Sequence, residues 1–202
     1  MRYRQVHLDF HTALECEDVG AQFDPETFAK TVAMGHVDTI NIFAKCHHGY
    51  SYYPTKVGTP HPTMTRDLLG EQIEALHRRD IRCPIYVSVM WDDLAGIQHP
   101  GWVVTNRDGT QRMRHPLSGE WGWTTMDVAS PYRDYYMAQV EELLDNYEMD
   151  GLWADICFVV PNYSPWSQQR MRDAGVPLED DRAVLAYADE RMREFMDDVT
   201  SL

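Results

Sequence analysis

The spacing of apolar and polar residues along the chain predicts strands that alternate with helices. Apolar residues at every second position predict four strands, at residues 5–11, 39–45, 82–89 and 151–158. Apolar residues at helical spacing predict four helices, at about residues 25–34, 66–79, 131–146 and 179–199. Strands and helices that alternate in this way are typical of a parallel sheet whose crossover connections are right-handed.

Local residue signals refine this outline. The first predicted helix has a favourable start, with Asp24 as N-cap, Pro25 in the first turn and Glu26 beside it. Residues 91–129 lack a clear period and are rich in Gly, Pro, Trp and His, so we expect a long loop there. Loops of this length are usually functional or disordered. A second, Pro-bearing loop is expected before the last helix.

Each predicted strand has one apolar face and one polar or aromatic face. The polar faces consist of His7, Asp9 and His11; Asn41, Phe43 and Lys45; Tyr86 and Ser88; and Trp153, Asp155 and Cys157. Strands of a doubly wound sheet are apolar on both faces. A (β/α)8 TIM barrel instead turns one face of each strand inwards and carries its active site at the C-terminal strand ends. The pattern therefore favours an α/β fold of the barrel type.

Four strand–helix units make up half of a (β/α)8 barrel, which typically needs about 250 residues. We therefore expect residues 1–202 to be one partial TIM-barrel domain, the N-terminal half of a barrel and a fragment of a larger protein. The alternative is that two half-barrels associate. The outer strands of a half-barrel have open edges that pair readily with other strands, so we expect a homo-oligomer in that case.

Composition narrows the choice of partner and compartment. The chain has 18 Lys and Arg against 32 Asp and Glu, a net charge of -14, which argues against nucleic acid as a partner. It contains no run of 18 apolar residues and no apolar segment near its start, so we expect neither a membrane span nor a secretory signal. No CxxC motif occurs. We therefore expect free thiols in the cytoplasm, rather than disulfides or a zinc site, at Cys16, Cys46, Cys83 and Cys157.

The end of the second predicted strand carries the densest set of polar side chains. Lys45, His47 and His48 stand there in front of Gly49. A cation and two imidazoles close a core poorly, but they can line a polar pocket for a small hydroxylated ligand. Asp155 lies near the end of the fourth strand, and a carboxylate at a barrel strand end is a catalytic candidate. Cationic neighbours would keep the Asp155 carboxylate ionised, which suits a nucleophile. The alternative is that Asp155 only forms an ion pair that stabilises the barrel interior.

His7, Asp9 and His11 form a second polar set on one face of the first strand. This spacing can present three ligands to one divalent metal ion, as in barrel metallohydrolases. The alternative is a polar pocket floor in which each side chain hydrogen-bonds its neighbour. Barrel metallohydrolases need further ligands from later strands, so we favour substrate binding and expect no metal ion and no cofactor.

Aromatic side chains gather in the loops after the second and third strands, where rings can stack on the apolar faces of sugars. They are Tyr50, Tyr52, Tyr53, Trp91, Trp102, Trp121 and Trp123. Some of these rings are expected only to pack the loops, Trp91 and Trp102 above all. Trp91 nevertheless stays, with Tyr86 and Trp153, among the candidates for substrate binding.

Two segments carry a family resemblance. Residues 44–50, AKCHHGY, resemble a Lys-His-His-Asp-Gly-Phe segment, and residues 153–155, WAD, resemble a Trp-Phe-Asp segment. Both segments belong to the α-L-fucosidase group of glycoside hydrolases, whose catalytic domain is a TIM barrel, and to a related set of uncharacterised glycosyl hydrolases. Weaker resemblances lie, in the same order along the chain, at residues 23–29, 67–72, 86–91 and 132–147. Jointly these motifs are fairly specific, although each is weak alone.

The resemblance implies a glycoside hydrolase, similar to an α-L-fucosidase and retaining, that acts on a carbohydrate. In this interpretation Asp155 is the catalytic nucleophile, and His47 and His48 bind sugar hydroxyls. The full substrate-binding set that we predict is His7, Asp9, His11, Lys45, His47, His48, Tyr86, Trp91 and Trp153. The first strand differs from the fucosidase pattern, and the family's Asp is missing because Gly49 directly follows His48. The identity of the sugar therefore does not carry over.

A glycosidase also needs a second carboxyl group, about 5 Å from the first in retaining enzymes and about 6.5–9.5 Å in inverting ones. Asp92, Asp93 and Glu120 are the candidates on this chain, and we expect Glu71, Glu141 and Glu142 to be solvated. In the family that this chain resembles, the acid/base residue generally comes later in the barrel. We therefore expect this residue beyond Leu202, and we expect the isolated chain to lack activity. Two alternatives stay open: a metal-dependent hydrolase that uses the first-strand set, and a sugar-binding half-barrel without turnover.

Overall fold

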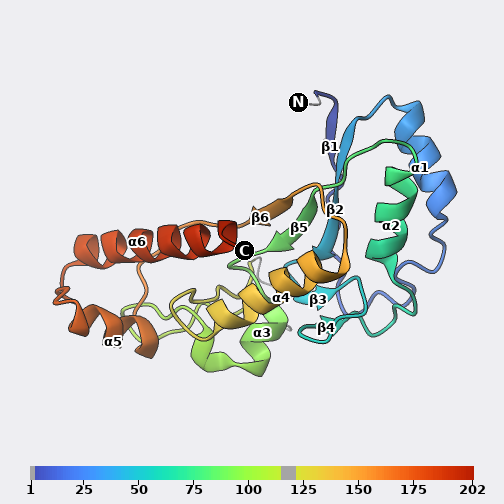
Figure 1. Ribbon diagram of the computed structural model, residues 1–202. Coiled ribbons are helices and arrows are strands. Elements are labelled where there is room, and N and C mark those ends of the chain that lie inside the picture. Colours follow the sequence, from blue (N-terminus) through green and yellow to red (C-terminus); the bar gives the residue numbers. More distant parts are fainter. Residues whose placement is uncertain (1–2, 115–121) are drawn as a thin grey trace. The chain divides into compact units, whose positions relative to one another are not determined.

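The computed structural model describes residues 3–114 and 122–202. The chain divides into two compact units, Met1–Ser88 with Glu142–Asp155, and Val89–Glu141 with Ile156–Leu202. The strands of the described sheet belong to the first unit, whereas the second unit is built mainly from helices and loops (Figure 1).

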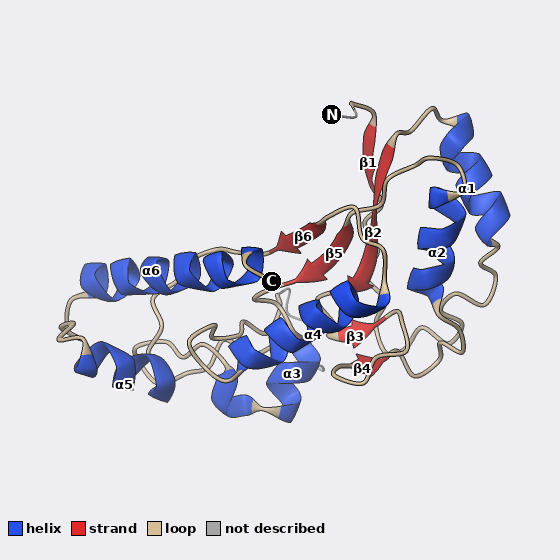
Figure 2. Ribbon diagram, in the orientation of Figure 1, coloured by secondary structure: helices blue, strands red, loops and turns tan. Residues whose placement is uncertain are grey.

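A six-stranded sheet lies at the centre of the first unit (Figure 2). Its parallel part contains, in spatial order, β1 (Gln5–His7), β2 (Thr39–Lys45), β5 (Ile85–Ser88) and β6 (Leu152–Asp155). Two short strands, β3 (Tyr50–Ser51) and β4 (Thr59–Pro60), follow β2, and β3 pairs with it in antiparallel fashion. The four parallel strands lie beside one another in chain order, as neighbouring strands of a (β/α)8 barrel do. Within the described residues β1 and β6 each pair with one neighbour, and the expected oligomer through these edges stays a prediction.

The helices of the first unit are fixed by their N-caps. Helix α1 (Pro25–Met34) has the predicted bounds, and the Thr27 amide donates to the side chain of Asp24 over 2.7 Å. Helix α2 (Leu68–His77) is shorter than the predicted segment because Asp67 stops the helix from starting earlier, by accepting the Gly70 amide at 2.9 Å. The two helices lie side by side in Figure 1 and contact each other.

The core of the first unit lies between β2, β5 and α2. All seven residues of β2 are buried. Ile42 and Phe43 of β2 are fully buried, as are Leu69 and Leu76 of α2. Burying one such side chain contributes about 1.5–3 kcal/mol to folding.

Strands β1, β5 and β6 are shorter than the sequence pattern predicts, whereas β2 has its predicted bounds. Strand β1 ends at His7, where its register with β2 ends opposite Asn41, so Asp9 and His11 lie in the segment that follows the strand. Strand β6 ends at Asp155 because Ile156 has a φ of 64°, which lies outside the extended region. The prediction of a strand over residues 151–158 was therefore too long at its C-terminal end.

The second unit contains helices that the sequence pattern missed. These are α3 (Asp93–Gln98), a 3-10 helix (Pro100–Trp102) and α5 (Pro165–Asp173); α6 (Asp181–Thr200) was predicted. Helix α4 (Tyr132–Asn146) was also predicted, and its last residues belong to the first unit. Asp92 caps α3 by accepting the Ala95 amide at 2.8 Å. Ser164 caps α5 with Pro165 in its first turn, where a proline is favourable rather than disruptive.

Two further observations concern disulfide bonds and membrane-spanning helices. The structure describes all four cysteines, and none of them forms a disulfide. Among the described residues, no helix combines the length and the apolar composition that crossing a bilayer requires.

Leu69→Ala should lower the free energy of unfolding by about 2–5 kcal/mol, because it removes a fully buried side chain and leaves a cavity. Urea unfolding followed by circular dichroism measures this change. Met34→Ala is the matched control, since Met34 is 71% exposed at the end of α1. Equal unfolding midpoints for the two variants would show that α2 does not contribute to this core.

Candidate active site

The chain turns back sharply at the end of β2, and this turn positions His47. The Gly49 amide donates to the carbonyl of Cys46 over 3.0 Å. Gly49 has a φ of 88°, a conformation that glycine adopts without steric cost. The chain then returns antiparallel to β2, with Ser51 opposite Lys45. The Cys-His-His-Gly motif is therefore a hairpin turn at the C-terminal end of a barrel-type strand.

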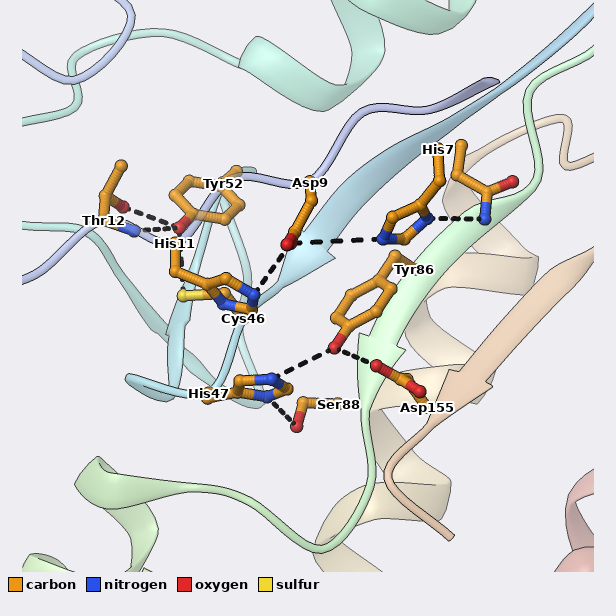
Figure 3. Close-up of polar contacts among 11 residues, drawn as sticks. His7, Asp9, His11, Thr12, Cys46, His47, Tyr52, Tyr86, Ser88 and Asp155 are labelled. Carbon is orange, nitrogen blue, oxygen red and sulfur yellow. Dashed lines mark hydrogen bonds and ion pairs between the residues drawn. The ribbon is translucent and has the colours of Figure 1, made fainter. Parts of the chain in front are cut away.

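Tyr86 of β5 and Asp155, the last residue of β6, contact each other. The Tyr86 hydroxyl donates to Asp155 Oδ2 over 2.7 Å (Figure 3). Burial, and next the hydrogen bond to this carboxylate, raise the pKa of Tyr86 far above its ordinary value. Phe43 of β2 stacks on the Tyr86 ring, with a centroid separation of 3.9 Å and an angle of 12° between the planes. The phenol is thus a fixed, protonated donor to the carboxylate.

His47 continues this chain of contacts from Tyr86 to Ser88. Its Nε2 lies 3.5 Å from the Tyr86 oxygen, and its Nδ1 lies 2.7 Å from Ser88 Oγ (Figure 3). Burial, and next the nearby His11, lower the pKa of His47 to about 3, so the imidazole is neutral at neutral pH. Because Tyr86 gives its one proton to Asp155, its oxygen can accept the Nε2 proton of His47. The Nδ1 atom then accepts from Ser88.

His11 and Asp9 stand beside this network although they lie beyond β1. The His11 ring stacks on His47, with centroids 4.2 Å apart and planes 24° apart. His11 Nε2 lies 2.8 Å from Asp9 Oδ1. Burial lowers the pKa of His11, and the carboxylate of Asp9 partly offsets this effect. The structure therefore brings His11, His47, Tyr86 and Asp155 together, although only Asp155 is the last residue of a strand.

His7 and Trp153 lie next to each other on β1 and β6. Their ring centroids are 5.3 Å apart, and the planes are tilted by 35°. His7 Nδ1 lies 3.2 Å from the side-chain nitrogen of Asn41, on the neighbouring strand β2. Trp153 is 45% exposed, so part of its indole ring is accessible to a ligand.

The first-strand set does not form a three-ligand metal site. Asp9 Oδ1 lies 2.8 Å from His11 Nε2 but 4.0 Å from His7 Nε2. Among residues 3–114 and 122–202, these three are not a group whose donor atoms all lie within 4.8 Å of one another. The structure thus gives no support to a metal-dependent hydrolase centred on them.

Lys45 and His48 were predicted to bind substrate together with His47. Lys45 is only 2% exposed and lies opposite Val87 of β5. His48 lies in the hairpin turn and is half-buried. Their contact with a sugar stays a prediction.

The aromatic and acidic candidates of the long loop have local roles in the second unit. Trp91 packs against Trp123, with centroids 6.3 Å apart. Asp92 is the cap of α3, and Asp93 accepts the Thr124 amide at 2.9 Å. These carboxylates therefore have structural roles that do not require a substrate. Two further candidates, Glu120 and Trp121, lie outside the described residues.

Sequence reasoning missed several contacts of the first unit. Tyr52 and Tyr53 are buried and pack the loop after β3 rather than offering a face to a sugar. Glu142, expected to be solvated, accepts from the hydroxyl of Tyr53 at 3.1 Å and from the amide of Lys56 at 2.6 Å. Ser88 was not among the candidates, although its position two residues after Tyr86 on the same strand face could have identified it.

Comparison with known proteins identifies the family. A family described as Hypothetical glycosyl hydrolase 6 matches residues 24–156, more than half of the chain. The chain belongs to this family. No curated protein matches the chain. The family assignment confirms the predicted relationship to glycosyl hydrolases.

Solved structures support the same relationship. The α-L-fucosidase isoenzyme 2 from Paenibacillus thiaminolyticus is 34% identical, with a TM-score of 0.91, over 98% of this chain and 30% of that one. The chain thus spans less than a third of that protein. An α-fucosidase from Thermotoga maritima has 20% identity and a TM-score of 0.52, over 88% of this chain and 36% of that chain. A hypothetical protein from Ruminiclostridium thermocellum has 13% identity and a TM-score of 0.63, over 90% of this chain and 87% of that chain. The last two show a shared mixed α/β fold, consistent with a TIM-barrel-like region.

The folded chain should lose stability between pH 7 and pH 5 because of His47. Its pKa is about 3 when folded and about 6.5 when unfolded, so the unfolded state binds a proton first as the pH falls. The contribution of neutral His47 to the free energy of unfolding is present above pH 6.5 and is smaller by about 2 kcal/mol at pH 5. Urea unfolding at both pH values measures the loss. In His47→Gln this loss should be smaller by about that amount, and an equal loss in both proteins would contradict the assignment.

Proposed function

We propose that the chain supplies the first four strand–helix units, within one partial barrel domain, of a retaining, α-L-fucosidase-like glycoside hydrolase. The observation that carries this proposal is Asp155, a carboxylate at the C-terminal end of a parallel strand, held by the hydroxyl of Tyr86. Membership of a glycosyl hydrolase family and the fold shared with α-fucosidases support the same reaction class. The substrate is a carbohydrate.

In the proposed mechanism Asp155 attacks the anomeric carbon of the sugar. The bond between this carbon and the leaving oxygen breaks, the leaving oxygen takes a proton from an acid, and a covalent glycosyl-enzyme forms. Water then attacks the same carbon, gives its proton to the group that acted as the acid, and releases Asp155. Tyr86 holds Oδ2 and would leave Oδ1 to attack. Its high pKa keeps the phenol protonated, so it remains a donor throughout the reaction.

The groups beside Asp155 have the chemistry of a sugar site. His47 is neutral, so its imidazole can exchange hydrogen bonds with sugar hydroxyls without the cost of burying a charge. Trp153 offers a half-exposed ring on the same strand as the nucleophile. Hydrogen bonds that strengthen as positive charge develops on the sugar ring would contribute to the rate. The described residues supply no assigned acid/base carboxylate, and we propose that another part of the barrel contributes it.

Asp155→Asn should lower kcat/KM on aryl glycosides by at least about 1,000-fold, because an amide cannot form the glycosyl-enzyme. The assay uses the protein encoded by the natural reading frame, with aryl α-L-fucosides tested first. Asp145→Asn is the matched control, since Asp145 is an exposed carboxylate on α4. Wild-type turnover by Asp155→Asn would rule out the nucleophile assignment. A wild-type protein that binds sugar without hydrolysing it would instead support a sugar-binding half-barrel.

Tyr86→Phe should lower kcat by about 10- to 100-fold, because a hydrogen bond to a charged group contributes about 1.5–3 kcal/mol. KM should change less. Because Phe retains the stacking on Phe43, the free energy of unfolding should fall by no more than the contribution of this hydrogen bond. Parallel kinetics and urea unfolding test this positioning role. An unchanged kcat would show that Asp155 does not need the phenol.

A further inference from the structure

Three metal-ligating side chains converge at the other end of the parallel strands. His77 is the last residue of α2, Cys83 lies two residues before β5, and Asp150 lies two residues before β6. His77 Nε2 is 2.9 Å from Asp150 Oδ2 and 3.4 Å from Cys83 Sγ. The three donor atoms all lie within 4.8 Å of one another. Since the strands run parallel, this cluster lies at their N-terminal ends, whereas the proposed active site lies at their C-terminal ends.

The geometry excludes a catalytic triad. A Cys-His-Asp triad uses one imidazole nitrogen for the nucleophile and the other for the carboxylate. Here Cys83 Sγ and Asp150 Oδ2 both approach the same atom, His77 Nε2. Three donor atoms that all lie within 4.8 Å of one another are instead compatible with binding one metal ion.

The spacing of the donors fits a tetrahedral zinc ion. Zinc bonds of about 2.3 Å to sulfur and about 2.0–2.1 Å to nitrogen or oxygen place tetrahedral ligands about 3.4–3.6 Å apart. The separation between Cys83 and His77 is 3.4 Å. The hydrogen bond of 2.9 Å between His77 and Asp150 would need to lengthen by only about 0.5 Å. A sulfur, an imidazole and a carboxylate together favour zinc over calcium or magnesium, which prefer oxygen ligands alone.

We propose that His77 Nε2, Cys83 Sγ and Asp150 Oδ2 form a structural Zn²⁺ site that ties the end of α2 to the starts of β5 and β6. The side chains of His77 and Asp150 are 27% and 23% exposed, so an ion can reach the cluster from the surface. A surface hollow is lined by both residues and by Glu148. A structural zinc site has four protein ligands, and the Glu148 carboxylate would have to move to the ion to supply the fourth. Cys83 Sγ is buried behind them.

Existing contacts hold the carboxylate ready for the ion. The Cys83 amide donates to Asp150 Oδ2 over 2.8 Å, and Arg82 Nε lies 3.9 Å from Oδ1. Binding of Zn²⁺ releases the thiol proton and leaves His77 as a neutral imidazole with its proton on Nδ1. Because the ion binds the folded chain and links three of its segments, it should also raise the unfolding temperature.

Titration of the reduced, chelator-treated chain with Zn²⁺ and with Co²⁺ tests the site. We expect one equivalent to bind, Co²⁺ to produce a thiolate-to-cobalt charge-transfer band, and Zn²⁺ to raise the unfolding temperature. In Cys83→Ser the band should disappear. In His77→Gln the affinity should fall by at least about 10-fold, since even partners of metal ligands have effects of that size.

Cys16→Ser is the matched control. Cys16 is exposed, and its substitution should leave the cobalt band unchanged. Circular dichroism of each variant without metal verifies that it is folded. The proposal is overturned if the wild-type chain binds no equivalent of either ion. It is equally overturned if a folded Cys83→Ser variant keeps the cobalt band, which would indicate an adventitious ion at other side chains. Neither readout depends on glycosidase activity.

Discussion

The parallel pairing of β2, β5 and β6 is the constraint on which the rest of the first unit depends. The register places Tyr86 opposite Trp153 and Ser88 opposite Asp155. Side chains alternate between the two faces of a strand, so a slip of one residue would turn the nucleophile candidate and its phenol donor to opposite faces. The same pairing separates two groups of side chains along the strands, since His47, Tyr86 and Asp155 lie towards one end and the Cys83 cluster lies at the other.

Burial gives this network its chemical character. Removal from water lowers the pKa of His47 and raises that of Tyr86, so both groups are neutral at neutral pH. A neutral imidazole and a protonated phenol can exchange hydrogen bonds with sugar hydroxyls and hold a carboxylate in place. The loss of stability expected at acidic pH and the positioning of Asp155 therefore have one physical origin, which is the desolvation of the strand ends.

The sequence predicts those features that local chemistry determines. Asp24 and Pro25 mark the start of α1, and the apolar run of β2 marks a buried strand; both segments have their predicted bounds. Features that depend on contacts distant in sequence were not predictable. Asp9 lies beyond β1 because the pairing with β2 ends before it. Glu142 accepts a hydrogen bond from the amide of Lys56, which lies 86 residues away in the sequence, and no local pattern predicts this contact.

The candidate site was partly predictable for the same reason. Strand-end residues such as His47 and Asp155 follow from alternation along strands, whereas the hydrogen bond from Tyr86 depends on the register between two strands. In the proposed reaction, Asp155 forms the covalent glycosyl intermediate. The most direct measurement incubates the protein with a 2-fluoro-fucosyl fluoride and maps the labelled peptide by mass spectrometry. We expect a fucosyl adduct on Asp155, and an adduct on any other carboxylate would rule out the nucleophile assignment.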